Sequence, residues 1–331
     1  MEGAALTAPE RNRARARAWA ELLRLPALFT VPGDALAGAT ALSARPDHRT
    51  LLAIGSSLCL YEAGMVLNDW ADRAEDAVDR PHRPLPSGRV SPTAAFTAAC
   101  AFTTSGLVLA ARAGRPALAI AAPLAATVWT YDLALKHTPA GPFAMAAARG
   151  LDLLLGAAAT AGNARPALRS AALLATHTLA VTTLSRQETR QGTPTAALAA
   201  LATTGALTWL VQRRPPTGLP LPRDRRSPDG LLPGRRGRTG PGSADRFPAP
   251  QSLTAAFAAT YAGTTARPYL HASLNPSPPL TQRAVGAGIR GTIPLQAALI
   301  ARSGAIATAT ALFTAALAPA ARILARRVSI T

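Results

Sequence analysis

Long apolar runs alternate with short polar segments along most of the chain, and this pattern predicts membrane-spanning helices. Each run is about twenty residues long, which is the length that an α-helix needs to cross the hydrocarbon core of a bilayer. We therefore expect an all-α fold, a polytopic transmembrane helical bundle with nine or ten spans around a central cavity. The expected spans are about 22–44, 50–68, 93–111, 115–131, 142–161, 167–184, 194–212, 252–271, 284–301 and 304–322.

The same pattern divides the chain into four parts. Residues 1–20 form a basic N-terminal tail, expected on the cytoplasmic side because arginine favours that side of a membrane. Residues 21–212 form a transmembrane core, and residues 252–331 form the C-terminal transmembrane helices of the same bundle. Between them, residues 213–251 are rich in Arg, Pro and Gly and lack an apolar period, which predicts a flexible insertion.

Composition agrees with a membrane protein. Of the 331 residues, 49% are hydrophobic and 16% are charged, with a net charge of +18. The arginines lie beside apolar runs and not on a basic face with interleaved aromatic residues, so membrane anchoring explains them better than nucleic-acid binding. We expect an integral protein of a bacterial cell membrane. The strong preference for arginine over lysine is typical of a GC-rich genome. Cys59 and Cys100 lie inside apolar runs and are expected to be core residues.

The densest group of carboxylates follows the second predicted span directly. Five positions at steps of three and four, four of them acidic, are expected to form one stripe on a single helix, with Asn68 one turn before Asp72. Grouped carboxylates repel one another unless a cation lies among them, and their hard oxygen atoms suit Mg²⁺. The stripe consists of Glu62, Met65, Asp69, Asp72 and Asp76.

An arginine-rich loop stiffened by proline follows this stripe. Arg80, Arg83 and Arg89 offer hydrogen-bond donors for an anionic group that the metal would also bind. An acidic helix end beside an ordinary loop is the simpler alternative, but the spacing and the loop sequence together favour a Mg²⁺-diphosphate site at a membrane surface.

These residues resemble the first aspartate-rich motif and the following loop of the UbiA superfamily of intramembrane prenyltransferases. The resemblance is carried by Asn68-Asp69-x-x-Asp72-x-x-x-Asp76 and by Arg83-Pro84-Leu85-Pro86-Ser87-Gly88. It implies that residues 68–76 hold Mg²⁺ on an isoprenyl diphosphate. The implied metal ligands are Asn68, Asp69, Asp72 and Asp76.

Two further segments resemble motifs of the same family, and the second resembles its motif less closely than the first. Tyr131 and Lys136, in YDLALK, loosely match a cytoplasmic loop in which the family's lysine binds diphosphate, and Lys136 is the one lysine of the chain. After the sixth span the family places a second aspartate-rich motif. This chain has a degenerate version there, with Glu188 between Arg186 and Arg190, so the arginines could contact phosphate oxygens in place of a second metal.

Charged residues within the predicted spans need partners. Arg149 and Asp152 are one helical turn apart in the fifth span, so they should pair or face a polar cavity, and a structural ion pair is favoured over catalysis. His177 in the sixth span is expected to be a hydrogen-bonded core residue.

We therefore predict a UbiA-like prenyltransferase that moves an isoprenyl group from an allylic diphosphate to an apolar or aromatic acceptor, with Mg²⁺ and an active site on the cytoplasmic side. The alternatives are an isoprenoid-binding protein without turnover and a cation-coupled transporter that uses Glu62, Asp69 and Asp72. The predicted catalytic residues are Asp72, Lys136 and Arg83, and the predicted substrate-binding residues are Arg83, Arg89, Lys136, Tyr131, Glu188 and Arg186.

Overall fold

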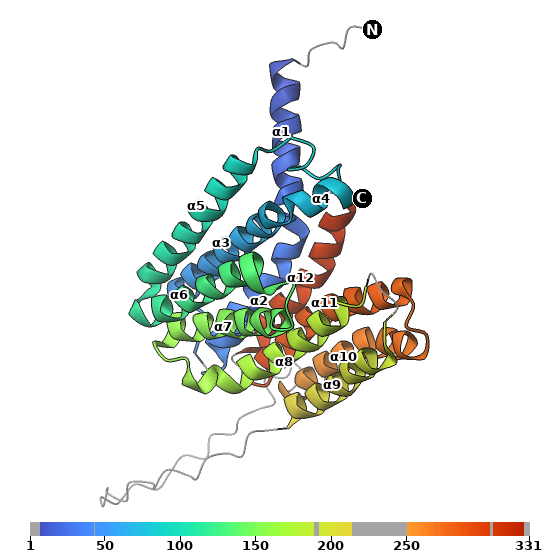
Figure 1. Ribbon diagram of the computed structural model, residues 1–331. Helices are drawn as coiled ribbons and strands as arrows, with labels where there is room; N and C mark the ends of the chain where they lie inside the picture. The colour runs from blue at the N-terminus through green and yellow to red at the C-terminus, as the bar shows by residue number, and fades with distance from the viewer. Residues whose placement is uncertain (1–6, 43, 189–191, 214–249, 305–306, 328–331) are drawn as a thin grey trace, which may run out of the picture.

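The computed structural model describes residues 7–42, 44–188, 192–213, 250–304 and 307–327, and these residues form helices and turns without any strand (Figure 1). The all-α prediction is therefore confirmed. The helices are α1 (Ala8–Leu22), the 3₁₀ helix η1 (Leu25–Thr30), α2 (Val31–Thr40), α3 (His48–Ala71), α4 (Arg73–Asp79), α5 (Pro92–Ala113), α6 (Arg115–Thr130), the π-helical turn η2 (Tyr131–Leu135), α7 (Gly141–Ala161), the 3₁₀ turn η3 (Arg165–Ala167), α8 (Leu168–Ser185), α9 (Pro194–Gln212), α10 (Pro250–Leu274), α11 (Pro278–Ala301) and α12 (Thr308–Arg327).

Six of the described helices are long and apolar enough to cross a membrane. They are α3, α5, α6 with its π-helical turn, α7, α9 and α11. Several faces of α5 and α6 remain uncovered by other helices and carry apolar side chains, which suits contact with lipid tails. The chain is therefore an integral membrane protein, and the total of nine or ten spans stays a prediction.

Neighbouring helices in the sequence pack side by side, from α5 through α6 and α7 to α8, and from α9 through α10 to α11 (Figure 1). The short helix α2 lies inside the bundle against α3, α7 and α11. Its contact with α7 is unusually close because both helices place a glycine there. A methyl group on Gly38 would overlap the carbonyl oxygen of Leu153, and one on Gly156 would overlap that of Ala35.

The prediction of one continuous first span over about 22–44 is wrong. The basic segment before it forms α1, and the chain then passes through a 3₁₀ helix before it enters the ten-residue α2. Arg24 adopts a left-handed backbone conformation with φ of 46°, which separates α1 from the next helix. Pro26 and Pro32 lie near the starts of their helices, where the missing N–H groups do no harm.

Two predictions about local structure near the acidic motif are also wrong. The carboxylate stripe does not lie on a single helix, because α3 ends at Ala71 and Asp72 joins it to α4 with non-helical backbone angles (φ −84°, ψ 2°). Tyr131 and Asp132 do not lie in a loop, because the π-helical turn continues α6 through Leu135. The predicted insertion at 213–251 lies outside the described residues except for residues 213, 250 and 251.

Candidate functional site

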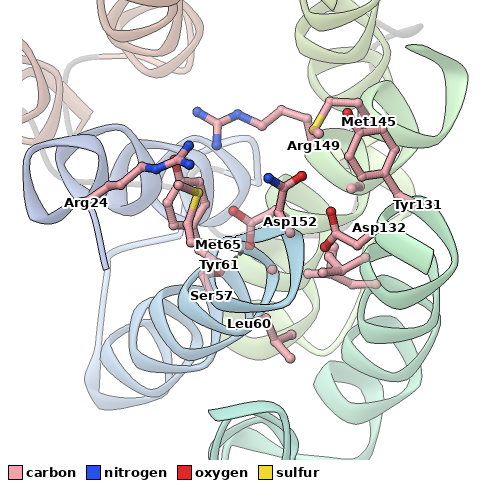
Figure 2. Close-up of a pocket in the computed structure, with 15 residues that line it drawn as sticks. Arg24, Ser57, Leu60, Tyr61, Met65, Tyr131, Asp132, Met145, Arg149 and Asp152 are labelled. Atoms are coloured by element: carbon pink, nitrogen blue, oxygen red, sulfur yellow. Dashed lines mark hydrogen bonds between the residues drawn. The ribbon is translucent and has the colours of Figure 1, made fainter. Parts of the chain in front are cut away.

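A cavity of about 280 Å³ lies between α3, α6, its π-helical turn and α7 (Figure 2). Most of its wall is apolar, which suits a hydrocarbon group. Polar side chains occur near Asn68 at one end and near Ser57 at the other, on the same helix. The apolar lining side chains include Leu60, Met65, Leu124, Val128 and Met145.

Buried carboxylates of the acidic motif lie next to the Asn68 end of this cavity. Asp69 is 4% exposed, and its Oδ1 accepts a hydrogen bond from Arg24 Nη2 at 2.6 Å. Asp76 is 2% exposed, and its Oδ2 accepts from Arg83 Nη1 at 2.7 Å. The same Arg83 atom lies 3.5 Å from Asp69, so one arginine links the two carboxylates. Arg80 adds a second cation to Asp76 at 3.3 Å.

Asp72 has a different partner, from a distant part of the chain. Its Oδ1 forms an ion pair with Lys136, which comes from the connection between α6 and α7, and lies 3.7 Å from His137 Nε2. The Asp72 side chain remains 20% exposed, more than the other two motif aspartates. We call Asp69, Asp72 and Asp76 with the cations Arg83 and Lys136 the acidic mouth.

The loop after α4 packs against α1 through apolar and ionic contacts. Leu85 and Val90 are buried against Ala18 and Leu22 of α1. Arg89 donates to both carboxylate oxygens of Glu21, at 2.6 and 3.1 Å, and to the carbonyl of His82 at 2.5 Å. The hydrogen bond to Glu21 raises the pKa of Arg89. Arg89 therefore ties the loop to α1, and it contacts none of the motif aspartates in the described structure.

The remaining predicted substrate-binding residues differ in their surroundings. Tyr131 lines the cavity. Arg186 donates to the backbone carbonyls of Lys136 (3.1 Å) and Thr138 (2.8 Å), so it holds the segment that carries the lysine. Glu188 is partly buried, and burial raises the pKa of its carboxyl group. Arg190 lies outside the described residues.

The opposite end of the cavity is polar as well. Arg149 Nε lies 3.0 Å from Asp34 Oδ2, so Arg149 pairs with a residue of α2 and not with Asp152. Asp152 accepts a hydrogen bond from Ser57, and both line the cavity. The favoured prediction of an ion pair between Arg149 and Asp152 is therefore wrong, although both side chains line the cavity. His177 forms core hydrogen bonds, with Tyr261 (3.1 Å) among its partners.

Sequence reasoning assigned no site role to three of these side chains. Arg24 and Asp34 precede the motif by more than thirty residues, and no local spacing connects them to it. Asp132 looked like a loop residue, yet it is 4% exposed and lines the cavity. A lone charge inside an apolar run was the one available signal for Asp34 and Asp132.

The side chains at the mouth suit a hard divalent cation. Among the described residues, all ion pairs of Asp69 and Asp72 use Oδ1. The second oxygen of each carboxylate forms no ion pair with these residues and is therefore a candidate metal ligand. Carboxylate and amide oxygens are the ligands that Mg²⁺ accepts. Ligand atoms of Asp72, Glu75 and His137 also lie within 4.8 Å of one another at the outer side of the mouth.

An acidic, cation-paired mouth above an apolar cavity in a helical membrane bundle defines the class of protein. The chain belongs to the UbiA prenyltransferase family, whose model matches residues 27–212. The resemblance seen in the sequence is therefore confirmed.

Two of the curated relatives that the chain resembles carry the same name. The chain is 38% identical over 128 residues to digeranylgeranylglyceryl phosphate synthase of Methanopyrus kandleri, covering 37% of this chain and 45% of the relative. It is 36% identical over 124 residues to the synthase of the same name from Methanothrix thermoacetophila, covering 37% and 46%. The chain thus matches about half the length of these relatives.

Solved structures share the fold. A UbiA homologue from Aeropyrum pernix K1 superposes with a TM-score of 0.58 at 16% identity, covering 83% of this chain and 96% of that one. A structure reported for digeranylgeranylglyceryl phosphate synthase in membranes gives a TM-score of 0.54 at 17% identity, covering 84% and 99%. The fold therefore extends well beyond the residues that the sequence relatives match.

Proposed function

We propose that this protein is an intramembrane prenyltransferase that takes an isoprenyl group from an allylic diphosphate. The observation that carries the proposal is the ion pair between Asp72 and Lys136 at an acidic mouth that adjoins an apolar cavity. A diphosphate needs cations, and an isoprenyl chain needs an apolar wall that excludes water. Membership of the UbiA family supports both requirements.

Each side chain of the mouth has a role in this proposal. Asn68, Asp69 and Asp72 would hold Mg²⁺, with Asp76 positioning Arg83 through their ion pair. When bound, Mg²⁺ supplies positive charge to the diphosphate oxygens as the bond to the allylic carbon breaks. Lys136 and Arg83 turn toward the same oxygens and stabilise the charge that develops on them. Arg186 keeps Lys136 in place through the backbone of its segment.

The acceptor that the relatives support best is a hydroxyl group on a glyceryl phosphate. This assignment follows from the name digeranylgeranylglyceryl phosphate synthase, which the relatives from both archaea carry. A geranylgeranyl diphosphate donor and a geranylgeranylglyceryl phosphate acceptor are therefore the first pair to test. The arginines of α1, on the mouth side of the bundle, favour a cytoplasmic mouth.

Asp72→Asn tests the proposal. The amide keeps the shape of the carboxylate and removes its charge, so it weakens both Mg²⁺ binding and the link to Lys136. We expect transfer from labelled geranylgeranyl diphosphate in detergent or nanodiscs to fall by about 100-fold or more. Binding of the unreactive thiolo analogue should lose its Mg²⁺ dependence.

Asp79→Asn is the matched control, because Asp79 is an exposed aspartate at the end of α4. It should transfer at the rate of the unmodified protein. Full turnover by Asp72→Asn would refute the role of Asp72 at the mouth.

Isoprenoid binding without turnover is a second candidate function. It is favoured by the arginines that neutralise Asp69 and Asp76, and by the degenerate second motif with Glu188 as its carboxylate. Mg²⁺-dependent binding of geranylgeranyl diphosphate with no release of diphosphate would support it. Cation transport is less well supported, because the buried Glu62 does not line the cavity.

A further inference from the structure

Asp132 lies in the π-helical turn that continues α6 toward the mouth. A π-helical turn inserts an extra residue into the helical repeat, and such turns occur frequently at functional sites. The turn places Asp132 on the wall of the cavity beside Tyr131, where Figure 2 shows its side chain among the lining residues. Asp132 is 4% exposed, so its carboxyl group lies within the protein.

This carboxyl group has no hydrogen-bonding or ion-pairing partner among the described residues. Its electrostatic neighbours are Lys136, which attracts it, and Asp72 and Asp69, which repel it. A buried carboxylate without a hydrogen-bond donor is costly, and an ionisable group at membrane depth is a functional candidate for that reason. A ligand that donates a proton or a hydrogen bond would remove this cost.

The position of Asp132 is between the mouth and the apolar wall. Lys136 follows it by four residues, and Gly64 of α3 lies beside it. Asn68 lies one helical turn beyond Gly64, about 6 Å along the axis of α3. The reactive carbon of an allylic diphosphate held at the mouth would therefore lie near Asp132.

Gly64 packs closely beside this carboxyl group. A methyl group at position 64 would lie 3.8 Å from Asp132 Oδ2 and 2.9 Å from Val128 Cγ1. The second contact is closer than real side chains tolerate, so any larger residue would narrow the cavity beside Asp132. A side chain at position 64 would therefore project into the part of the cavity that adjoins Asp132.

We propose that Asp132 is a further catalytic residue, the base that removes the proton from the acceptor hydroxyl. As the hydroxyl oxygen forms a bond to the allylic carbon, the bond from that carbon to the diphosphate oxygen breaks. The bonding electron pair leaves with the diphosphate, and the hydroxyl proton passes to the Asp132 carboxylate. The inference rests on the proposed function and assigns the residue that accepts the proton of the acceptor hydroxyl.

Asp132→Asn tests this role, because the amide preserves shape and cannot accept the proton. With geranylgeranyl diphosphate and geranylgeranylglyceryl phosphate as probes, we expect kcat to fall by about 100-fold or more. Mg²⁺-dependent binding of the thiolo donor analogue should stay within about threefold of the unmodified protein, a difference of under 1 kcal/mol. Asp79→Asn is again the exposed control, with unchanged kcat.

Two further variants separate a chemical role from a structural one. Asp132→Ala should regain part of its activity when formate is added, because the small carboxylate can occupy the vacated space. Gly64→Ala should raise the KM for the acceptor and leave donor binding unchanged. Gly205→Ala is its control, because a methyl group there meets no atom within 4 Å.

The outcomes distinguish this inference from the proposed function. An Asp132→Asn protein that transfers at the unmodified rate overturns the inference alone. One that loses donor binding as strongly as Asp72→Asn also overturns it, because Asp132 would then belong to the diphosphate site. If the unmodified protein binds no donor analogue with Mg²⁺, the proposed function fails first, and the role of Asp132 fails with it.

Discussion

At the scale of single residues, each acidic side chain of the mouth faces a basic one. Asp69 faces Arg24 and Arg83, and Asp72 faces Lys136. Such pairs hold cations where a diphosphate can bind them. A substrate that carries both negative charge and Mg²⁺ can therefore exchange partners with the mouth without leaving a charge unpaired.

Arg24→Gln tests this exchange. Arg24 lines the cavity and donates to Asp69 at 2.6 Å, so the variant removes a cation from the place where the diphosphate arrives. We expect the KM for geranylgeranyl diphosphate to rise by about tenfold or more, because a hydrogen bond to a charged group contributes about 1.5–3 kcal/mol. Steady-state kinetics with varied donor measure it.

Arg73→Gln is the matched control, since Arg73 lies near the mouth but packs over the ring of Trp70 at 4.5 Å. Its donor KM should not change. An unchanged KM in Arg24→Gln would mean that Arg24 serves the fold of the mouth and not the donor.

At the scale of elements, α3 connects the two ends of the cavity and begins with a strong cap. Asp47 Oδ1 accepts hydrogen bonds from the backbone N–H groups of Arg49 and Thr50, both at 3.0 Å. These bonds satisfy two of the free N–H groups at the helix start. Asp47 is exposed, so its carboxyl group can gain or lose a proton as the pH changes. Its effect on stability can therefore be measured as a function of pH.

Asp47→Ala should lower the free energy of unfolding by about 1 kcal/mol at neutral pH. Slight burial raises the pKa of Asp47, but the hydrogen bonds from Thr50 and Arg49 outweigh it and hold that pKa below its ordinary value. A lowered pKa in the folded state means that the stabilisation is present above the ordinary pKa of aspartate and is lost as the pH falls through the folded-state pKa.

Thermal unfolding in detergent between pH 3 and pH 7, a range that brackets the ordinary pKa of about 3.9, tests both parts. The difference between the unmodified protein and Asp47→Ala should shrink toward the acidic end. A difference that is independent of pH would contradict the capping role of the charged carboxylate.

At the scale of the whole molecule, one buried network joins the N-terminal, central and C-terminal helices. Gln296 of α11 donates to Asp34 Oδ1 at 2.6 Å and to the carbonyl of Thr30 at 2.7 Å, while Arg149 of α7 pairs with the same aspartate. Asp34 is fully buried. The C-terminal helices are thereby attached to the core that carries the motif.

Arg149→Met should destabilise the protein by about 3–5 kcal/mol, because it removes the basic partner of a fully buried carboxyl group. The double variant Asp34→Asn/Arg149→Met should recover most of this loss, since the amide needs no counter-charge. Unfolding of both variants in the same detergent measures the coupling. Equal loss in the single and the double variant would show that Arg149 acts through packing alone.

The sequence predicted a helix well where an apolar run and the residues at its two ends define that helix locally. The span at 194–212 coincides with α9, because an apolar run bounded by Pro194 and Arg213 defines both ends locally. The path of 22–44 could not be predicted, because hydropathy does not record the left-handed turn at Arg24. The aspartates of the mouth were visible as a motif. Arg24 and Lys136 approach these aspartates only through the packing of distant helices.

The close contact between α2 and α7 has an evolutionary consequence. Since neither Gly38 nor Gly156 has space for even one added carbon, these positions cannot drift, whereas the side chains that shape the apolar wall can vary in size with the substrate. Diversification of this scaffold toward new isoprenoids should accordingly alter the cavity lining first and leave the helix pair beneath it untouched.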